Sequence, residues 1–160
     1  MKGKGRWTAC ALAVVLARCA PLGLSVPAPS DEEAWAFRTL ARTREVASAA
    51  TGVGAEPTAQ GCAMRVLLDS EKARERFEAL SRQPRAEART YAAMGLCLSK
   101  SPRCQEAREA LRGDTTQIST INGCIGGMIR PSSFLGFFGN SYWSYVGARG
   151  CAPRHMRRMD

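Results

Sequence analysis

Apolar residues recur every three or four positions over long stretches of the chain, which is the period of amphipathic α-helices. The first helix is expected to begin at a capping box over residues 30–33, where acidic side chains favour a helix N-terminus, and to reach about Ala50. A loop with two glycines and a proline follows over residues 51–57. Two more helices are predicted over residues 58–68 and 71–81, the second largely charged and therefore on the surface.

The segment from Gln83 to Gly113 has the clearest pattern, that of two helices with a short joint. Over residues 85–99 apolar and small side chains cover nearly the whole circumference, as in a helix that is buried on several sides. Ser101 and Pro102 then provide an N-cap and a first-turn proline for a second helix, which is amphipathic. The predicted fold class is therefore mainly α, a small stack of helical hairpins.

The same segment resembles a known class of helical repeat. The residues that resemble one HEAT-type repeat are Pro84, Arg89, Ala92-Ala93 and Gly95-Leu96, followed by the second amphipathic helix. A poorer copy precedes it, with Ala59, Ala63, Leu67-Leu68, Phe77 and Leu80. The similarity covers about 55 residues and implies a small HEAT-like scaffold of stacked helices with no chemistry of its own.

After residue 113 the composition changes, and a short β-hairpin is expected. Residues 115–121 are rich in β-branched side chains, and Asn122-Gly123 is a typical two-residue turn before Cys124 and Ile125. Two adjacent glycines, at positions 126 and 127, should weaken the returning strand. The alternative is a loop attached to the helices.

Residues 131–150 contain six of the eleven aromatic side chains, separated by glycines and serines and without an acidic residue. One interpretation is that this segment folds back over the open end of the helical stack and fills core. The other is that part of it stays exposed as a contact surface for a protein, a glycan or a membrane interface. The candidate interaction surface then consists of Phe137, Phe138, Tyr142, Trp143 and Tyr145.

The first 29 residues resemble a bacterial signal peptide. Lys2, Lys4 and Arg6 precede an apolar run over residues 8–17, which is too short to cross a bilayer. We therefore expect a periplasmic or secreted protein. Residues 16–19 also approximate a lipoprotein signal, so lipidation at Cys19, with membrane contact through the lipid, is an alternative, as is a cytosolic protein with a misleading start.

Five cysteines follow the predicted signal, and export would allow their thiols to pair. The expected pairs are Cys97 with Cys104, across the joint between two helices, and Cys124 with Cys151. Cys62 lies on the apolar face of its predicted helix and is expected to be a buried free thiol. The alternative is five packed thiols in a reducing cytosol.

Charge and motifs indicate no specific chemistry. The formal net charge of +9 falls to +5 when the first 29 residues are removed, which suits loose attraction to anionic surfaces and does not predict a nucleic-acid partner. No phosphate-binding glycine loop, zinc-protease helix or nucleophile elbow occurs, so no cofactor is expected. Cys124, Cys151 and His155 lack the paired short spacings of structural zinc sites, and no metal or catalytic residue is predicted.

These observations divide the chain into four predicted parts. They are a signal segment (1–29), a helical repeat-like domain (30–113), a Gly/aromatic extension packed on it (114–151) and a basic tail (152–160). The expected function is non-catalytic, as a structural or protein-binding module of the cell envelope with an unknown protein or envelope component as partner. The rivals are a small exported enzyme with its site in the C-terminal segment, near Asp114 or His155, and a lipid-anchored scaffold.

Overall fold

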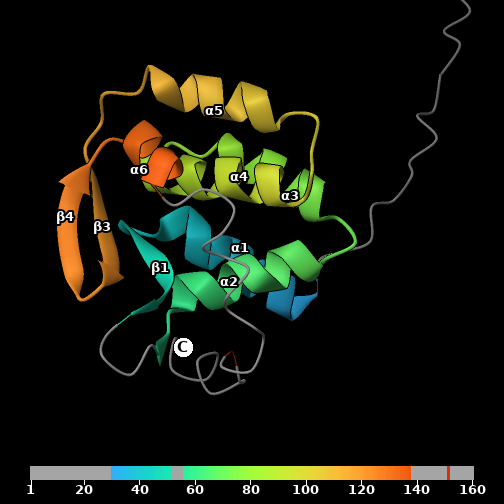
Figure 1. The fold of residues 1–160 in the computed structure, drawn as a ribbon. Coiled ribbons are helices and arrows are strands. Elements are labelled where there is room, and N and C mark those ends of the chain that lie inside the picture. Colours follow the sequence, from blue (N-terminus) through green and yellow to red (C-terminus); the bar gives the residue numbers. More distant parts are fainter. Residues whose placement is uncertain (1–29, 52–55, 138–150, 152–160) are drawn as a thin grey trace, which may run out of the picture.

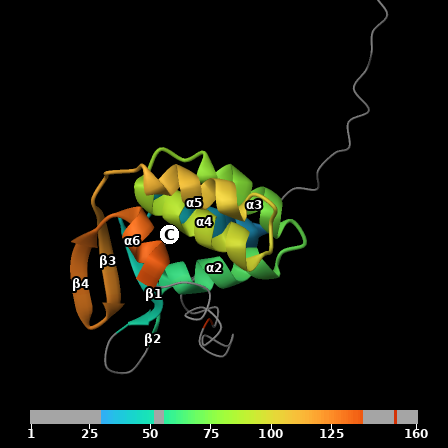
Figure 2. The ribbon, with the colours of Figure 1, turned by 45° about the horizontal axis from the view of Figure 1, so that its top comes forward.

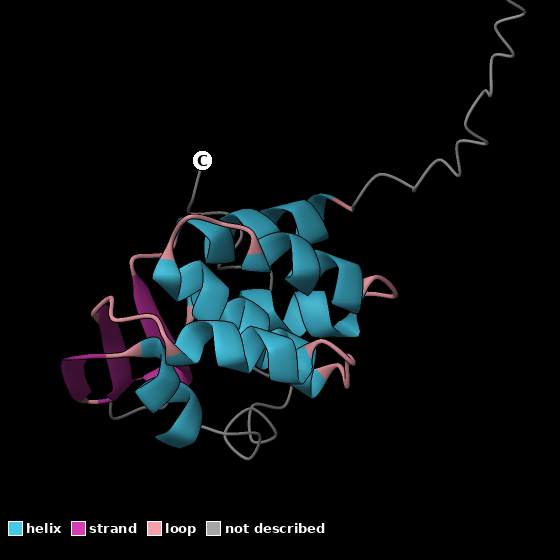
Figure 3. Cartoon of the chain, turned by 90° about the horizontal axis from the view of Figure 1, so that it is seen from above, coloured by secondary structure: helices cyan, strands magenta, loops and turns pink. Residues whose placement is uncertain are grey.

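The computed structural model describes residues 30–51, 56–137 and 151. The described elements, in chain order, are α1 (Asp31–Arg42), β1 (Glu45–Thr51), β2 (Glu56–Pro57), α2 (Ala59–Asp69), α3 (Ala73–Ser81), α4 (Ala86–Leu98), α5 (Cys104–Arg112), β3 (Ile118–Gly123), β4 (Ile125–Ile129) and α6 (Pro131–Phe137). The fold is mainly helical with a small sheet at one end of the helical stack (Figures 1 and 3), which confirms the predicted fold class.

Helix α4 lies in the middle of the stack and organises the core. It contacts the five other helices as well as β1 and β3 (Figures 1 and 2). Nine of its 13 residues are buried, in agreement with an apolar pattern that covers nearly its whole circumference. Gly95 lets α3 approach closely, because a Cβ atom at this position would overlap the aromatic ring of Phe77. The predicted helices over residues 58–68, 71–81 and 85–99 correspond to α2, α3 and α4.

The first predicted helix is correct at its start and wrong at its end. The Ser30 hydroxyl accepts a hydrogen bond from the Glu33 N–H at 3.1 Å, as a capping serine does. The helix ends at Arg42 and does not reach Ala50. At Thr43 the chain becomes extended, and the threonine hydroxyl donates a 2.8 Å hydrogen bond to the Glu45 carbonyl.

The alanine-rich segment that follows, residues 45–51, forms strand β1. Four consecutive residues of β1, from Val46 to Ala49, are buried, as expected for a strand covered on both faces. The hydroxyl of Tyr91 on α4 accepts a hydrogen bond from the Ala47 N–H at 2.8 Å and donates one to the Ala47 carbonyl at 3.1 Å. Sheet pairing and this link to α4 override the helix propensity of alanine.

The sheet joins segments that lie far apart in the sequence. Its strand order is β2-β1-β3-β4, with β1 and β3 parallel and the other two pairs antiparallel. Strands from both sides of residue 113 thus share one sheet. The predicted hairpin is present as β3 and β4, but Asn122 pairs with Ile125, so the loop is Gly123-Cys124 and lies one residue after the predicted turn. Gly123 has a φ of 59°, a conformation that glycine adopts without strain.

Helix α6 bears on the two interpretations of the aromatic segment. Phe134 is 2% exposed and belongs to the main core, as the core-filling interpretation expects. The predicted surface residues Phe138, Tyr142, Trp143 and Tyr145 lie outside the described residues, and Phe137 ends α6 at their border.

Candidate interaction surface

Among the described residues, the last strand of the sheet presents a free edge. Among the described strands, β4 pairs with β3 alone and therefore ends the sheet. Residues that flank a two-residue hairpin loop exchange both backbone hydrogen bonds, and bonded and non-bonded pairs then alternate. Ile125, Gly127 and Ile129 thus direct their backbone groups toward β3, in agreement with a 3.2 Å hydrogen bond from the Thr120 hydroxyl to the Gly127 carbonyl. Gly126 and Met128 direct theirs outward; we call this free side of residues 125–129 the β4 edge.

Two large apolar side chains of the β4 edge are exposed, whereas Ile129 is partly buried against the core. Ile125 is 76% exposed and Met128 is 60% exposed, and they are the large exposed apolar side chains of the described chain. No charged residue occurs between Asp114 and Arg130. Proteins usually protect free edge strands with charges, prolines or bulges, because an unprotected edge can pair with another strand. The β4 edge contains neither a charged residue nor a proline over its whole length.

Two of the expected cysteine assignments are wrong, and one is confirmed. Cys97 and Cys104 form a disulfide across the joint between α4 and α5. Cys151 pairs with Cys62 and not with Cys124, and the Cα atoms of this pair lie 5.3 Å apart. Cys62 is buried as expected, but it is not a free thiol. Of the described cysteines, Cys124 has the free thiol, which lies exposed in the hairpin loop next to the β4 edge.

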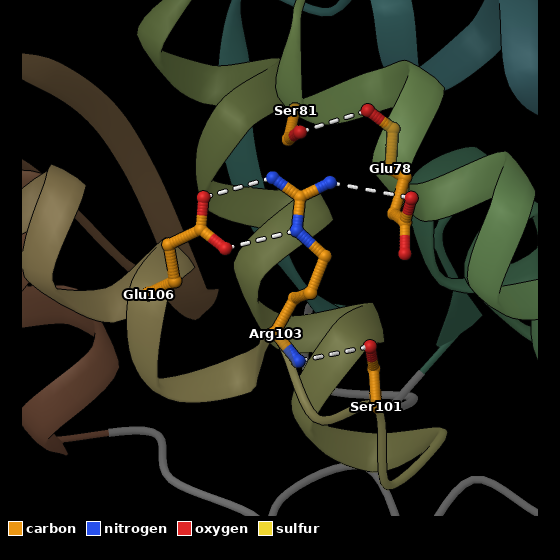
Figure 4. Close-up of polar contacts among 5 residues, drawn as sticks. All are labelled: Glu78, Ser81, Ser101, Arg103 and Glu106. Carbon is orange, nitrogen blue, oxygen red and sulfur yellow. Dashed lines mark hydrogen bonds and ion pairs between the residues drawn. The ribbon is translucent and has the colours of Figure 1, made fainter.

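A second candidate site is a cavity of about 220 Å³ beneath α5. Its lining includes Ser81 from α3, Arg89 and Leu96 from α4, and Arg103, Glu106 and Ala107 at the start of α5. Figure 4 shows the guanidinium of Arg103 between two carboxylates. It donates to both carboxylate oxygens of Glu106, at 2.8 and 2.9 Å, and to Glu78 on α3 at 3.2 Å.

These contacts are more typical of packing between two helices than of a ligand site. The hydrogen bonds and charge of Glu106, and then of Glu78, raise the pKa of Arg103, while Arg103 lowers the pKa of Glu106. Both groups therefore stay charged and neutralise each other, so neither is suited to exchange protons in catalysis. Their contacts hold α5, of which Leu111 is the one buried residue, against α3.

The other end of α5 is held in a similar way. Arg89 donates to a carboxylate oxygen of Asp114 at 2.6 Å, in a pair whose side chains are 30% and 14% exposed. Hydrogen bonds from Thr116, and then the guanidinium of Arg89, lower the pKa of Asp114. The lowered pKa keeps Asp114 ionised and paired with Arg89 at neutral pH. His155 lies outside the described residues.

The described residues contain neither a group of metal ligands nor a membrane-spanning helix. No three His, Cys, Asp or Glu side chains in this part of the chain are grouped so that they could hold a metal ion. None of its helices combines the length and the apolar character that are needed to cross a membrane.

Ile125 and Met128 were not predicted as surface residues. The aromatic cluster is the more prominent apolar feature of the sequence, and it was chosen as the candidate surface. A sequence signal for them exists, namely a predicted hairpin strand without a charged residue on either face. No protein-family model matches the chain, and comparisons with curated proteins and with solved structures find no match either. The resemblance to HEAT-type repeats therefore stays a prediction.

Proposed function

We propose that this chain is an exported, non-catalytic protein-binding module of the bacterial envelope and that the β4 edge is its contact surface. The observation that carries the proposal is an edge strand without a charge or a proline, with Ile125 and Met128 exposed. A partner that contributes an extended segment would add a strand to the sheet. Main-chain hydrogen bonds would hold it, and apolar side chains would determine which partner fits.

Two features support the exported part of the proposal. The disulfides Cys62–Cys151 and Cys97–Cys104 are of the kind that persists in an oxidising compartment. The first 29 residues have the charge and the short apolar run of a cleaved signal. Lipidation at Cys19 would place the same scaffold on a membrane and leave the β4 edge as the contact surface.

The contact surface is tested by photo-crosslinking in cells. A benzophenone amino acid replaces Met128 in one strain and Glu109 in a control strain, because Glu109 is exposed on α5 and is not part of the sheet. The proposal expects a crosslinked species of one defined mass from position 128 and none from position 109. Equal labelling from both positions, or none from position 128, contradicts it.

The compartment is tested by mass spectrometry of the envelope fraction without a reducing agent. We expect a chain that lacks the signal segment, with Cys62–Cys151 and Cys97–Cys104 linked and a free thiol at Cys124. A diacylglyceryl group on an N-terminal Cys19 would select the lipid-anchored form. A full-length chain with all thiols free would place the protein in the cytosol and remove the exported part of the proposal.

A further inference from the structure

We propose that the strand that pairs with the β4 edge is β4 of a second copy of this chain, antiparallel to the first and related to it by a twofold axis at Gly127. The inference rests on the proposed function, because it requires the β4 edge to be a protein contact. It specifies the partner and the register, which the proposed function leaves open.

The backbone of β4 allows this pairing without changing the β3–β4 ladder. Gly126 and Met128 direct their N–H and C=O groups away from β3, as derived from the pairing register. With the axis at Gly127, Gly126 lies opposite Met128 of the second copy, and Met128 lies opposite its Gly126. Both pairs exchange two backbone hydrogen bonds, so all the outward groups of the two residues are satisfied.

The side chains are complementary in the same register. The sequence of β4 is IGGMI, which is apolar at both ends and has glycine at its centre. On one face, Ile125 lies opposite Ile129 of the second copy, which is partly buried against its own core. On the other face, the long side chain of Met128 lies opposite a residue without a side chain. At the axis Gly127 faces its own copy in a non-hydrogen-bonded pair, the position where two strands approach most closely.

No contact among the described residues requires glycine at position 126 or 127. A Cβ atom at Gly127 would meet no atom within 4 Å, and one at Gly126 would meet the Thr120 carbonyl oxygen at 3.7 Å, an ordinary contact. A paired strand lies in the plane of the sheet and Cβ atoms point out of it, so glycine at these positions permits the pairing without being required for it.

Charge does not oppose a second copy. No charged side chain lies on β4, so two copies bring no like charges together along the paired strands. The two Arg130 side chains would lie at opposite ends of the joined strands, each beside position 124 of the other copy. The other edge of the sheet differs, because β2 is two residues long and consists of Glu56 and Pro57, a charge and a proline that hinder pairing.

Closed twofold dimers are the commonest assemblies of soluble proteins, and this one would join two sheets into one. A five-residue edge is small, so the association should depend on concentration. The first test is sedimentation velocity of the full chain, expressed as encoded and recovered with its disulfides, over a wide concentration range. We expect a monomer–dimer equilibrium.

The Met128→Pro variant tests the backbone pairing. Proline removes an N–H that points outward, a position at which edge strands tolerate it, so the subunit should keep its circular dichroism and unfolding transition. Dimerisation should weaken by about tenfold or more, because each copy loses a backbone hydrogen bond. The Met128→Ala variant, which keeps the N–H, should lose less.

A cysteine pair tests the register and does not depend on the proline variant. In a Cys124→Ser background, Gly127→Cys places two thiols at the axis, whereas Gly126→Cys places them about 7–8 Å apart on the diagonal. Oxidised glutathione is added; two protein thiols form one disulfide, and the oxidised glutathione is reduced to two thiols. The Gly127→Cys chain should form linked dimers several-fold faster than the Gly126→Cys chain.

The outcomes separate this inference from the proposed function. A chain that stays monomeric at all concentrations overturns the inference, as does a dimer that Met128→Pro leaves intact and that Gly127→Cys does not trap faster than Gly126→Cys. If photo-crosslinking from position 128 then yields a different protein, the proposed function stands with another occupant of the β4 edge. If position 128 yields no crosslink either, both fall.

Discussion

Helix α4 and strand β4 both carry small residues at their centre, and the structure uses them in opposite ways. Every residue of α4 from Thr90 to Leu96 is buried, and a Cβ atom on Gly95 would overlap the ring of Phe77. In β4 the residues from Ile125 to Met128 are exposed, and a Cβ atom on Gly127 would meet nothing. Packing among the described residues accounts for glycine in α4 but not in β4.

This difference suggests that α4 determines the stability of the subunit, whereas β4 determines its association with another strand. The side chains of α4 hold together elements from the whole chain, so changes in and around α4 should lower the free energy of unfolding. The exposed side chains of β4, Ile125 and Met128, contribute little to the subunit. Changes at these positions should leave unfolding unchanged and affect the contacts that the β4 edge makes with another strand. The following substitutions test this separation in pairs.

Removing a large side chain next to α4 should give the largest effect. Phe77→Ala removes a fully buried ring and should lower the free energy of unfolding by about 3–5 kcal/mol. Ile125→Ala, on the exposed strand, should change it by about 0.5 kcal/mol or less. Denaturant unfolding of dilute protein measures both values. Similar decreases in the free energy of unfolding for the two variants would contradict the distinction between the two regions.

Adding one methyl group to a glycine should distinguish the regions next. Gly95→Ala forces the Phe77 ring to move and should destabilise the fold by about 2–3 kcal/mol. Gly127→Ala adds its methyl group in open space and should cost about 0.5 kcal/mol or less. Because the cost at Gly95 comes from contact with one ring, it should shrink in a Phe77→Leu background. An unchanged cost there would show that the contact is not its origin.

The hydrogen bonds between α4 and the sheet should have a smaller effect. Tyr91→Phe removes the hydroxyl that accepts from the Ala47 N–H at 2.8 Å and leaves this buried donor without that acceptor. We expect a loss of about 1–2 kcal/mol in thermal unfolding. Hydrogen exchange of the Ala47 amide should accelerate as well, while the amides of β4 should keep their rates. Equal acceleration in both strands would mean that the sheet opens as one unit.

The smallest effect is expected at Asp114, where the chain passes from α5 toward the hairpin. Asp114→Asn weakens the contact with Arg89 and should cost about 1 kcal/mol. Because the folded state lowers the pKa of Asp114, this stabilisation is complete above the ordinary value of 3.8 and is lost as the pH falls through the folded-state value. The wild type and the Asn variant should therefore converge in stability at acidic pH. A constant difference across the acidic range would show that the charge of Asp114 does not cause it.

The helices α2 to α4 could be predicted because their patterns are local. Apolar residues at spacings of three and four lie within each helix, and the buried character of α4 follows from apolar side chains around its whole circumference. The hairpin was also predictable, although its loop lies at Gly123-Cys124 and the Asn-Gly pair had indicated Asn122-Gly123. The absence of charge on the returning strand is visible in the sequence, but which strand ends the sheet depends on the pairing of β1 with β3, so the β4 edge itself was not predicted.

The sequence by itself determined a mainly helical fold, the N-cap at Ser30 and the Cys97–Cys104 disulfide, whose partners lie seven residues apart across one joint. Only the tertiary structure decided that residues 45–51 form a strand and that Cys62 pairs with Cys151, at a sequence separation of 89. The physical reason is the same in both cases. An alanine-rich segment has a weak local preference that sheet pairing can override, and a distant cysteine pair depends on which surfaces meet, so both are decided by contacts between segments far apart in the chain.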